Sequence, residues 1–369
     1  MKKKVLFPAF LAALALPLCM QAKSINLTAE FIGEYDAKAD YVAFAKEVNG
    51  QMADEGFVLL KNDGFLPMTG DESVSVVGKA SIKLARGGAG SGSGSIDGSV
   101  GSDSTLNLKA SLTAAGFTQN PVTDAFYNSS SKSGSGRTNG NDGWKGNSEV
   151  TIGETPIESV LNEDGLVDSF AEYGDAAIMV IAREGSEGCD VKTCNAHDSI
   201  KTNSSSKAIS NKHALELSDN EQALFDLLHD HFDHIIMIIN SSNIFECGQF
   251  EDDEKVSGVL WIGNPGDVGP MAIGRILTGE VNPSGRTVDT WARDFTADPT
   301  FQNFSDNAQT NLVEVNGEEY YAPADTMFNA DGTPMRSYGT DKSYTNTSSP
   351  KWDSARGCMI QAKQIWRSA

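Results

Sequence analysis

Short apolar runs recur along the chain, and each has the length of a β-strand. The run at 176–182, Ala-Ala-Ile-Met-Val-Ile-Ala, has no polar position. Such a run is typical of a strand in a parallel sheet that helices cover on both faces. A β-branched run at 73–77 ends at Gly78 and also suits a buried strand. Two further strands are predicted at 234–239 and 259–262.

Segments with helical spacing lie between these runs. Ser218 and Glu221 have the spacing of a capping box, which predicts a helix that begins there and runs to about residue 231. Gly116 follows the last apolar position of an earlier helical segment and is expected to end that helix. The other segments with helical spacing are 41–58, 106–115 and 270–277.

The alternation of strand and helix predicts an α/β fold over residues 58–292, a sandwich of about six mostly parallel strands with helices on both faces. A helical lead-in at 23–57 precedes it. Residues 129–148 are rich in Ser, Gly and Asn, which indicates a flexible surface insertion. Trp144 within it suits either stacking on a sugar ring or packing. Residues 293–369 lose periodicity, and irregular structure is expected there.

The N-terminus has the pattern of a secretory signal. Three lysines at positions 2–4 precede an apolar run at 5–18, and small residues then lead to Ala22. The run is shorter than the about 20 residues of a comfortable membrane span, although a retained anchor is the alternative. We expect a signal peptide at 1–22 and a secreted or cell-surface protein. No other apolar stretch is long enough to span a bilayer.

Charge and cysteine content exclude several classes of partner. The formal net charge of −21 argues against nucleic acid and anionic membrane surfaces, which repel an acidic protein. It is compatible with neutral substrates such as sugars. Cys189 and Cys194 could form a disulfide after export, but with His197 they offer too few ligands for a zinc site. No metal or cofactor is predicted.

A glycine-rich segment, Arg-Gly-Gly-Ala-Gly-Ser-Gly at 86–92, follows the strand at 73–77. A phosphate-binding P-loop requires a lysine and then Ser or Thr after its last glycine, and this segment has none there. A dinucleotide-binding segment would lead straight into a helix, whereas Ser, Gly and Asp continue here to residue 103. We interpret the segment as a loop that lines a cleft.

An acidic loop follows the strand at 176–182. Residues 183–190 read Arg-Glu-Gly-Ser-Glu-Gly-Cys-Asp, so Glu184, Glu187 and Asp190 stand on a loop with glycine hinges. It lies at the carboxyl end of a predicted parallel strand, where open α/β sheets place their functional loops. From its residues alone, the loop is more typical of a solvated charged surface than of a functional site.

Five segments together resemble the α/β domain of glycoside hydrolase family 3. The clearest resemblance is at 266–290, where Gly269, Ala272, Leu277 and Gly279 precede Asn-Pro-Ser-Gly-Arg at 282–286. The other four segments are Glu-Gly-Phe-Val-Leu-Leu-Lys-Asn at 55–62, Val-Val-Gly at 76–78 with the glycine-rich segment after it, Ser-Glu-Gly at 186–188, and the leucine-rich stretch at 213–228. The resemblance covers residues 41–292.

The resemblance implies a β-glucosidase-like hydrolase of O-glycosyl bonds, with a β-linked oligosaccharide or glucoside as substrate. In this family an aspartate nucleophile comes from a barrel domain, and the α/β domain supplies the acid/base glutamate. Glu187 falls at the position of that glutamate, with Glu184 as second choice. Asp190 is more consistent with orienting the loop. Glu187 would protonate the leaving oxygen and then deprotonate the attacking water.

The resemblance does not extend to a barrel. An α/β domain that follows the signal directly resembles the inverted domain order of some family members, and the barrel would then come second. Residues 293–369 are too few for an eightfold barrel of about 250 residues. We therefore expect the barrel to be missing or supplied by another chain, and this chain alone to have little activity. The alternatives are a secreted, non-catalytic carbohydrate-binding or interaction module and a nucleotide-binding α/β protein.

Overall fold

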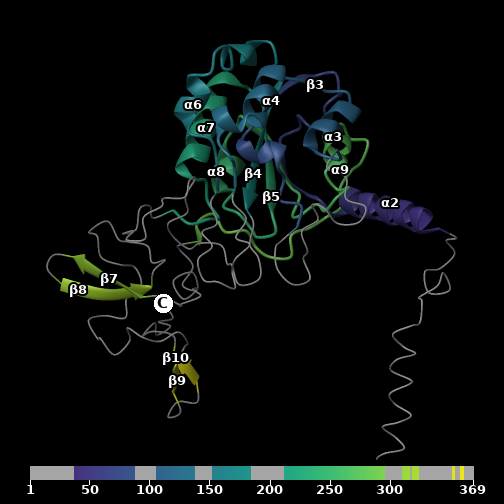
Figure 1. Cartoon of the computed structure of the whole chain (residues 1–369). Helices are drawn as coiled ribbons and strands as arrows, with labels where there is room; N and C mark the ends of the chain where they lie inside the picture. Colours follow the sequence, from purple (N-terminus) through teal and green to yellow (C-terminus); the bar gives the residue numbers. More distant parts are fainter. Residues whose placement is uncertain are drawn as a thin grey trace, which may run out of the picture. The chain divides into compact units, whose positions relative to one another are not determined.

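The structure, a computed structural model, describes four main ranges, 37–87, 105–137, 152–183 and 212–295 (Figure 1). Beyond them it describes the backbone of four short strands. The chain divides into two compact units, residues 1–49 and 50–369. Helix α2 (Lys38–Gly56) crosses this boundary. No helix in the described ranges is long and apolar enough to cross a membrane.

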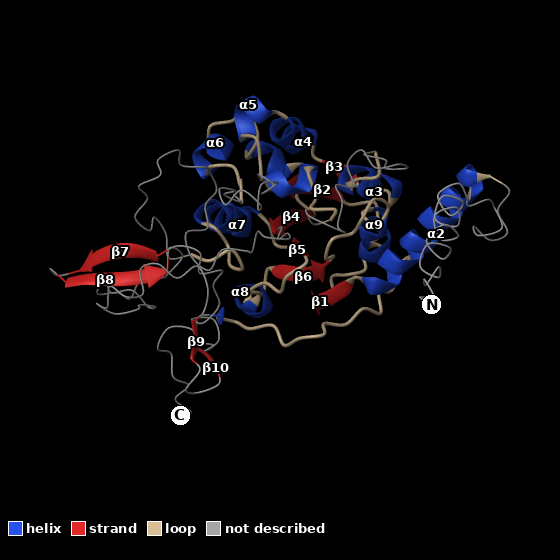
Figure 2. Cartoon of the chain, turned by 60° about the horizontal axis from the view of Figure 1, so that its bottom comes forward, coloured by secondary structure: helices blue, strands red, loops and turns tan. Residues whose placement is uncertain are grey.

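Six strands of the larger unit form one sheet in the order β1-β6-β5-β4-β2-β3 (Figure 2). Neighbouring strands are parallel, except that β1 is antiparallel to β6. This confirms the predicted sheet of about six mostly parallel strands. The strands are β1 (Val58–Asn62), β2 (Ser73–Val77), β3 (Thr118–Gln119), β4 (Ala176–Arg183), β5 (Ile235–Ser241) and β6 (Val256–Trp261).

The central strands are buried on both faces, as their uninterrupted apolar sequences predict. Every residue of β4 and β5 is buried. Because successive side chains of a strand point to opposite faces, Met179 and Ile181 enter one core, whereas Ile178 and Val180 enter the other. Burial of this apolar surface on both sides is the main favourable contribution to the stability of the sheet.

Helices cover each face of the sheet. Side chains of α4, α6, α7 and α8 enter the core with Met179, and side chains of α2, α3 and α9 enter the core with Ile178. The described helices after α2 are η2 (Lys79–Ile82), α3 (Leu108–Ala114), α4 (Pro121–Asn128), α5 (Ser130–Ser133), α6 (Ile157–Leu161), η4 (Asp168–Ala171), α7 (Asp219–His231), α8 (Gly248–Asp252) and α9 (Met271–Leu277).

Local capping determines where two of these helices begin. The predicted capping box of α7 is present: Glu221 N donates to Ser218 Oγ at 3.2 Å, and Ser218 N donates to Glu221 Oε2 at 2.9 Å. Helix α4 was not predicted from the sequence. Its signals are Asn120, whose side chain accepts hydrogen bonds from the first turn, and Pro121 at the first helical position.

The Asn-Pro-Ser-Gly-Arg segment at 282–286 packs against the residues that lead into β1. Ser284 N donates to Glu55 O at 3.1 Å. A Cβ on Gly285 would lie 2.4 Å from Gly56 O and 2.5 Å from Phe57 O. Only a glycine allows the two backbones to approach so closely. The segment therefore has a structural role in holding the antiparallel edge of the sheet.

Residues 129–137 of the predicted flexible insertion at 129–148 include a short helix, although most of these residues are exposed. Helix α5 follows α4 directly, and the side chain of Ser133 is 1% exposed. The reason is a long-range contact: Lys79 Nζ donates to Ser133 Oγ at 2.8 Å and draws this polar segment onto the domain. The remainder of the insertion, from residue 138, lies outside the described residues.

Two antiparallel strand pairs occur within 293–369, where the sequence predicted irregular structure. They are β7 (Thr310–Val315) with β8 (Glu318–Pro323), and β9 (Lys351–Asp353) with β10 (Cys358–Ile360).

Candidate functional site

Successive strands are added to one side of β2 and then to its other side, so the strand order of the sheet reverses between β2 and β4. From β2 the chain continues to β3 on one side, then passes back to β4 and adds β5 and β6 on the other side. Open α/β sheets bind ligands outside the carboxyl ends of their strands at such a switch point. The site is therefore expected where β2 ends at Val77 and β4 ends at Arg183.

The turn after β2 is the place where nucleotide-binding sheets hold a phosphate, and here a carboxylate of the chain fills it. Lys79 N donates to both carboxylate oxygens of Glu154, at 3.0 and 2.9 Å, and Thr155 N donates to Oε1 at 2.8 Å. Gly78 has a φ of 91°, which favours glycine. Because these backbone donors are already paired, the turn is not arranged as a phosphate cradle. This weighs against the nucleotide-binding alternative.

The side chain of Lys79 is buried beneath the same turn. Its Nζ donates to Tyr127 O at 2.7 Å and to Ser133 Oγ. Burial lowers the pKa of Lys79, and the negative charge of Glu154 partly opposes that shift. Burial also raises the pKa of the Tyr127 hydroxyl above its usual range, and Glu154 adds to the effect. Lys79 and Glu154 thus hold the turn in place.

The segment after β4 is anchored at its base by Arg183. The guanidinium of Arg183 donates to both oxygens of Glu221, at 2.7 and 2.6 Å, and its Nη2 donates to Glu216 O at 2.8 Å. Its Nε donates to Ala214 O. Both charged side chains are almost completely buried. Arg183 therefore ties the end of β4 to the chain that returns at Lys212.

A second arginine anchors the glycine-rich segment. Arg86 Nη1 lies 3.0 Å from Asp267 Oδ1, and Arg86 Nη2 donates to Leu106 O at 2.9 Å. Just before it, Ala85 N donates to Asn240 Oδ1 at 2.5 Å, and Asn240 lies near the end of β5. The two ends of this loop are consequently held at the carboxyl edge of the sheet.

The structure describes the chain on either side of the acidic loop in sequence, up to Arg183 and again from Lys212. Glu184, Glu187 and Asp190 lie outside the described residues. The other candidates that lie outside them are Trp144, Cys189, Cys194 and His197. The described ends of the two loops start from β2 and β4, the strands that flank the switch point.

Sequence reasoning missed the anchoring roles of Arg183 and Asn240. Each is a polar residue at the carboxyl end of an otherwise apolar strand, and each is buried at 3% or less exposure. Lys, Arg and Asn are seldom fully buried unless they are paired. A polar residue that ends an apolar strand is therefore the signal that could have indicated these anchors.

The described residues contain no cluster of three metal-ligating side chains. Cys247 is a free, partly buried thiol. Burial, together with the charge of Glu251, raises its pKa to about 12. A thiol with so high a pKa is a poor nucleophile and a poor metal ligand at neutral pH.

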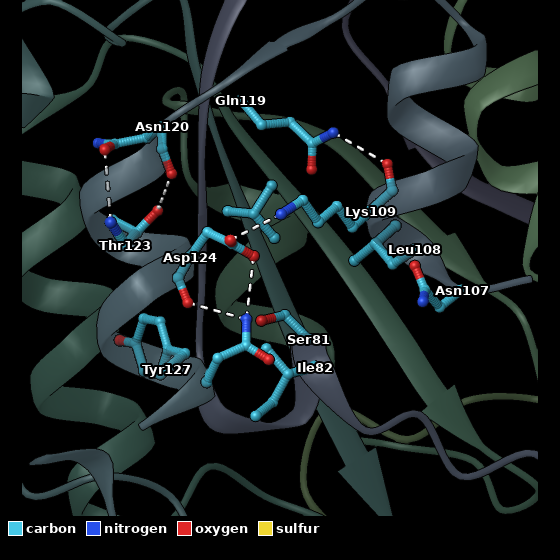
Figure 3. Close-up of a pocket in the computed structure, with 12 residues that line it drawn as sticks. Ser81, Ile82, Asn107, Leu108, Lys109, Gln119, Asn120, Thr123, Asp124 and Tyr127 are labelled. Carbon is cyan, nitrogen blue, oxygen red and sulfur yellow. Dashed lines mark hydrogen bonds and ion pairs between the residues drawn. The ribbon is translucent and has the colours of Figure 1, made fainter. Parts of the chain in front are cut away.

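A crevice opens between the start of α3 and α4 (Figure 3). Its volume of about 80 Å³ is well below the ~300 Å³ at which pockets for whole small molecules begin. In Figure 3 the side chain of Lys109 on α3 and that of Asp124 on α4 point toward each other. The crevice lies beyond the short strand β3 rather than between the ends of β2 and β4.

Comparison with known proteins identifies relatives of this domain. The family model described as Glycosyl hydrolase family 3 C-terminal domain matches residues 57–334. Beta-glucosidase A of Butyrivibrio fibrisolvens is 28% identical over 270 residues, which are 71% of this chain and 30% of that protein. A beta-glucosidase of Ruminococcus albus is 29% identical over 266 residues, 72% of this chain and 24% of that protein.

Solved structures share the fold at lower identity. A beta-glucosidase from Paenibacillus barengoltzii has a TM-score of 0.53 at 23% identity, over 72% of this chain and 26% of that one. Beta-glucosidase 3B from Thermotoga neapolitana, in complex with glycerol, has a TM-score of 0.52 at 18% identity, over 80% of this chain and 43% of that one. This chain thus spans less than a third of the two curated relatives.

Proposed function

This chain belongs to glycosyl hydrolase family 3, and we propose that it supplies the acid/base side of an enzyme that hydrolyses β-linked glycosides. Glu187 is the proposed acid/base residue. The observation that carries the proposal is the position of Arg183: the segment with Glu187 begins at the carboxyl end of β4, on one side of the switch point.

The anchors around this position suit a catalytic loop. Because Arg183 is paired with Glu221 inside the protein, the base of the loop is fixed before a substrate arrives. A carboxyl group must be held close to its working position to act efficiently, and rigid anchoring of its loop provides this. Arg86 gives the glycine-rich segment a comparable anchor across the switch point.

The second carboxylate of the reaction is proposed to come from a barrel domain, encoded in the same gene or on another chain. A retaining glycosidase needs two carboxyl groups about 5–5.5 Å apart. Among the described residues, the buried acids Glu154 and Glu221 at this edge are bound to backbone donors or to Arg183. Neither is free to attack a sugar. Glu187 alone would then protonate a leaving group without a nucleophile.

The substrate class follows from the relatives and the charge. The relatives named above are beta-glucosidases, and another is named a probable beta-D-xylosidase. Neutral sugars suit a chain with a formal charge of −21 because they are not repelled by it. Export through the N-terminal signal is part of the same proposal, and N-terminal sequencing of the mature protein would test it.

The experiment combines the full chain with the complementary part of a related β-glucosidase, fused or added as a separate chain. Aryl β-glucosides with good and poor leaving groups are compared for the wild type, Glu187→Gln and the matched control Glu184→Gln. Loss of a general acid costs about 10²–10⁴-fold. The loss in Glu187→Gln should be largest for the poor leaving group, which needs protonation most.

Two results would count against this assignment. Equal losses for both leaving groups would mean that Glu187 does not protonate the leaving oxygen, and an effect in Glu184→Gln instead would reassign the role. Saccharide binding without turnover in any combination would favour the non-catalytic carbohydrate-binding module.

A further inference from the structure

The edge of the sheet at β3 leaves part of β2 without a neighbouring strand. The ladder between β2 and β3 has only two pairs and stops at Val74 and Gln119. Asn120 N donates to Val74 O, so the alternate residues of β2 turn their backbone groups toward β3. The N–H and C=O of Val76 therefore face the same side, beyond the end of β3, where Val76 lines the crevice.

The crevice is largely apolar, and polar side chains from two helices on opposite faces of the sheet stand around its opening. Lys109 Nζ of α3 donates to Asp124 Oδ2 of α4 at 2.7 Å, and Asn128 Nδ2 donates to Asp124 Oδ1 at 3.0 Å. Gln119 Nε2 donates to Lys109 O at 2.9 Å. These bonds fix the geometry of the walls, and Figure 3 shows Lys109, Asp124 and Gln119 around one opening.

Three of the polar residues, Lys109, Gln119 and Asn128, keep hydrogen-bonding capacity that the described residues do not use. An ammonium has three donors, and Lys109 uses one of them on a side chain. Within the described ranges, the carbonyl oxygens of the Gln119 and Asn128 side chains accept no bond. The crevice thus offers both donors and acceptors beside apolar surface from Val76 and Ile82, which is 37% exposed.

We propose that this crevice binds a saccharide through two neighbouring hydroxyl groups, at a position separate from the candidate active site. Because each hydroxyl both donates and accepts, a pair of them can bond to the donors and the acceptors at this opening. The ion pair of Lys109 with Asp124 leaves the opening without net charge, so an anion would meet a carboxylate as well as an ammonium. The apolar C–H face of a sugar ring suits Val76 and Ile82.

The crevice is large enough to hold only the end of a longer ligand. A volume of about 80 Å³ accommodates part of one ring and not a whole disaccharide. Most of the sugar would lie outside, and binding is therefore expected on the order of millimolar, as few atoms are desolvated. The choice of a saccharide as the ligand rests on the proposed function, whereas the crevice and its lining residues are observed independently of it.

The experiment follows the amide signals of the isotope-labelled full chain by NMR during titration with cellobiose. The expected result is a saturable shift of the backbone amide of Val76 and of the side-chain amides of Gln119 and Asn128. Lys109→Met should weaken this binding about tenfold or more, the effect of losing one charge-assisted hydrogen bond. The matched control is Lys132→Met, which removes another exposed lysine with a carboxylate partner, Glu163.

Every outcome decides for or against the crevice. Equal weakening by Lys132→Met, or no shift at these residues, would overturn the proposal. The proposal would also be overturned if inorganic phosphate produced the same shifts and displaced cellobiose, because the site would then bind anions. Shifts confined to Arg86 and Arg183 would place saccharide binding at the candidate active site alone. Glu187→Gln should leave the crevice signals unchanged, so failure of the catalytic assignment is distinguishable from failure of this one.

Discussion

Two ion pairs of this domain, Arg183–Glu221 and Lys109–Asp124, have similar geometry and opposite surroundings. The shortest N–O distances are 2.6 and 2.7 Å. The side chains of the first pair are 3% and 2% exposed, whereas those of the second are 60% and 31% exposed. The charges of a buried pair have lost their hydration, so separating them costs much free energy. The charges of an exposed pair can replace their mutual contact with contacts to water at little cost. We infer that the first pair serves the architecture and the second is available to a ligand.

The largest effect is expected from Arg183→Met, which leaves Glu221 buried without its partner. Removing one member of a buried pair destabilises a protein by about 3–5 kcal/mol. Urea unfolding monitored by circular dichroism measures the free energy of unfolding. The double variant Arg183→Met/Glu221→Leu should recover part of the loss because no charge is then left unpaired. A loss below about 1 kcal/mol in the single variant would break the contrast between the two pairs.

A second buried acid at the same edge should show a smaller effect. Glu154→Gln keeps the shape but replaces one acceptor oxygen with an amide group that faces the donor Lys79 N. Lys79 N can still donate to the remaining oxygen, whereas the new amide is a buried donor placed against another donor. A buried donor without a partner costs about 1–3 kcal/mol. The same unfolding measurement checks it, and Glu163→Gln at an exposed pair provides the control. If Glu154→Gln and Glu163→Gln lower the free energy of unfolding equally, burial does not explain the contribution of Glu154 to stability.

Alkaline pH should lower the stability of the folded protein through the buried hydroxyl of Tyr127. Its pKa is raised by burial, so the folded state resists losing the phenolic proton more than the unfolded state does. The stability that Tyr127 contributes is fully present below about pH 10 and is lost above it, at about 1.4 kcal/mol per pH unit. Tyr127→Phe should be less sensitive to pH between 10 and 11. Lys79 is present in both proteins, so its own titration cancels. Parallel pH curves for the two proteins would contradict this.

The smallest effect is expected from the exposed pair. Lys109→Met should change the free energy of unfolding by less than about 1 kcal/mol, since exposed ion pairs contribute little. Raising the salt concentration should reduce even this difference because exposed charges are screened. Chemical denaturation at low and high salt measures both. A loss comparable to that of Arg183→Met would mean that the crevice is a structural element and not an open surface.

Much of the fold was predictable because its signals are local. Strand β2 has the predicted bounds, β4 extends one residue beyond the prediction, and the capping box of Ser218 and Glu221 starts α7. Strand β3 was missed because a strand of two residues is too short to show an alternation of apolar and polar positions. Helix α4 was missed although Asn120 and Pro121 mark its start. The assignment of Glu187 stays a prediction, since the structure describes only the ends of its segment.

The sequence by itself determined the α/β class, the positions of the central strands and the two loops that follow β2 and β4. It did so because burial on both faces leaves an uninterrupted apolar run that can be recognised without knowing the neighbours. Only the tertiary structure decided which charged residues are buried. Arg183 meets Glu221 across 38 positions, and exclusion of water from this pair depends on segments that are distant in the chain. Arg86 meets Asp267 across 181 positions, and this pair stays partly exposed.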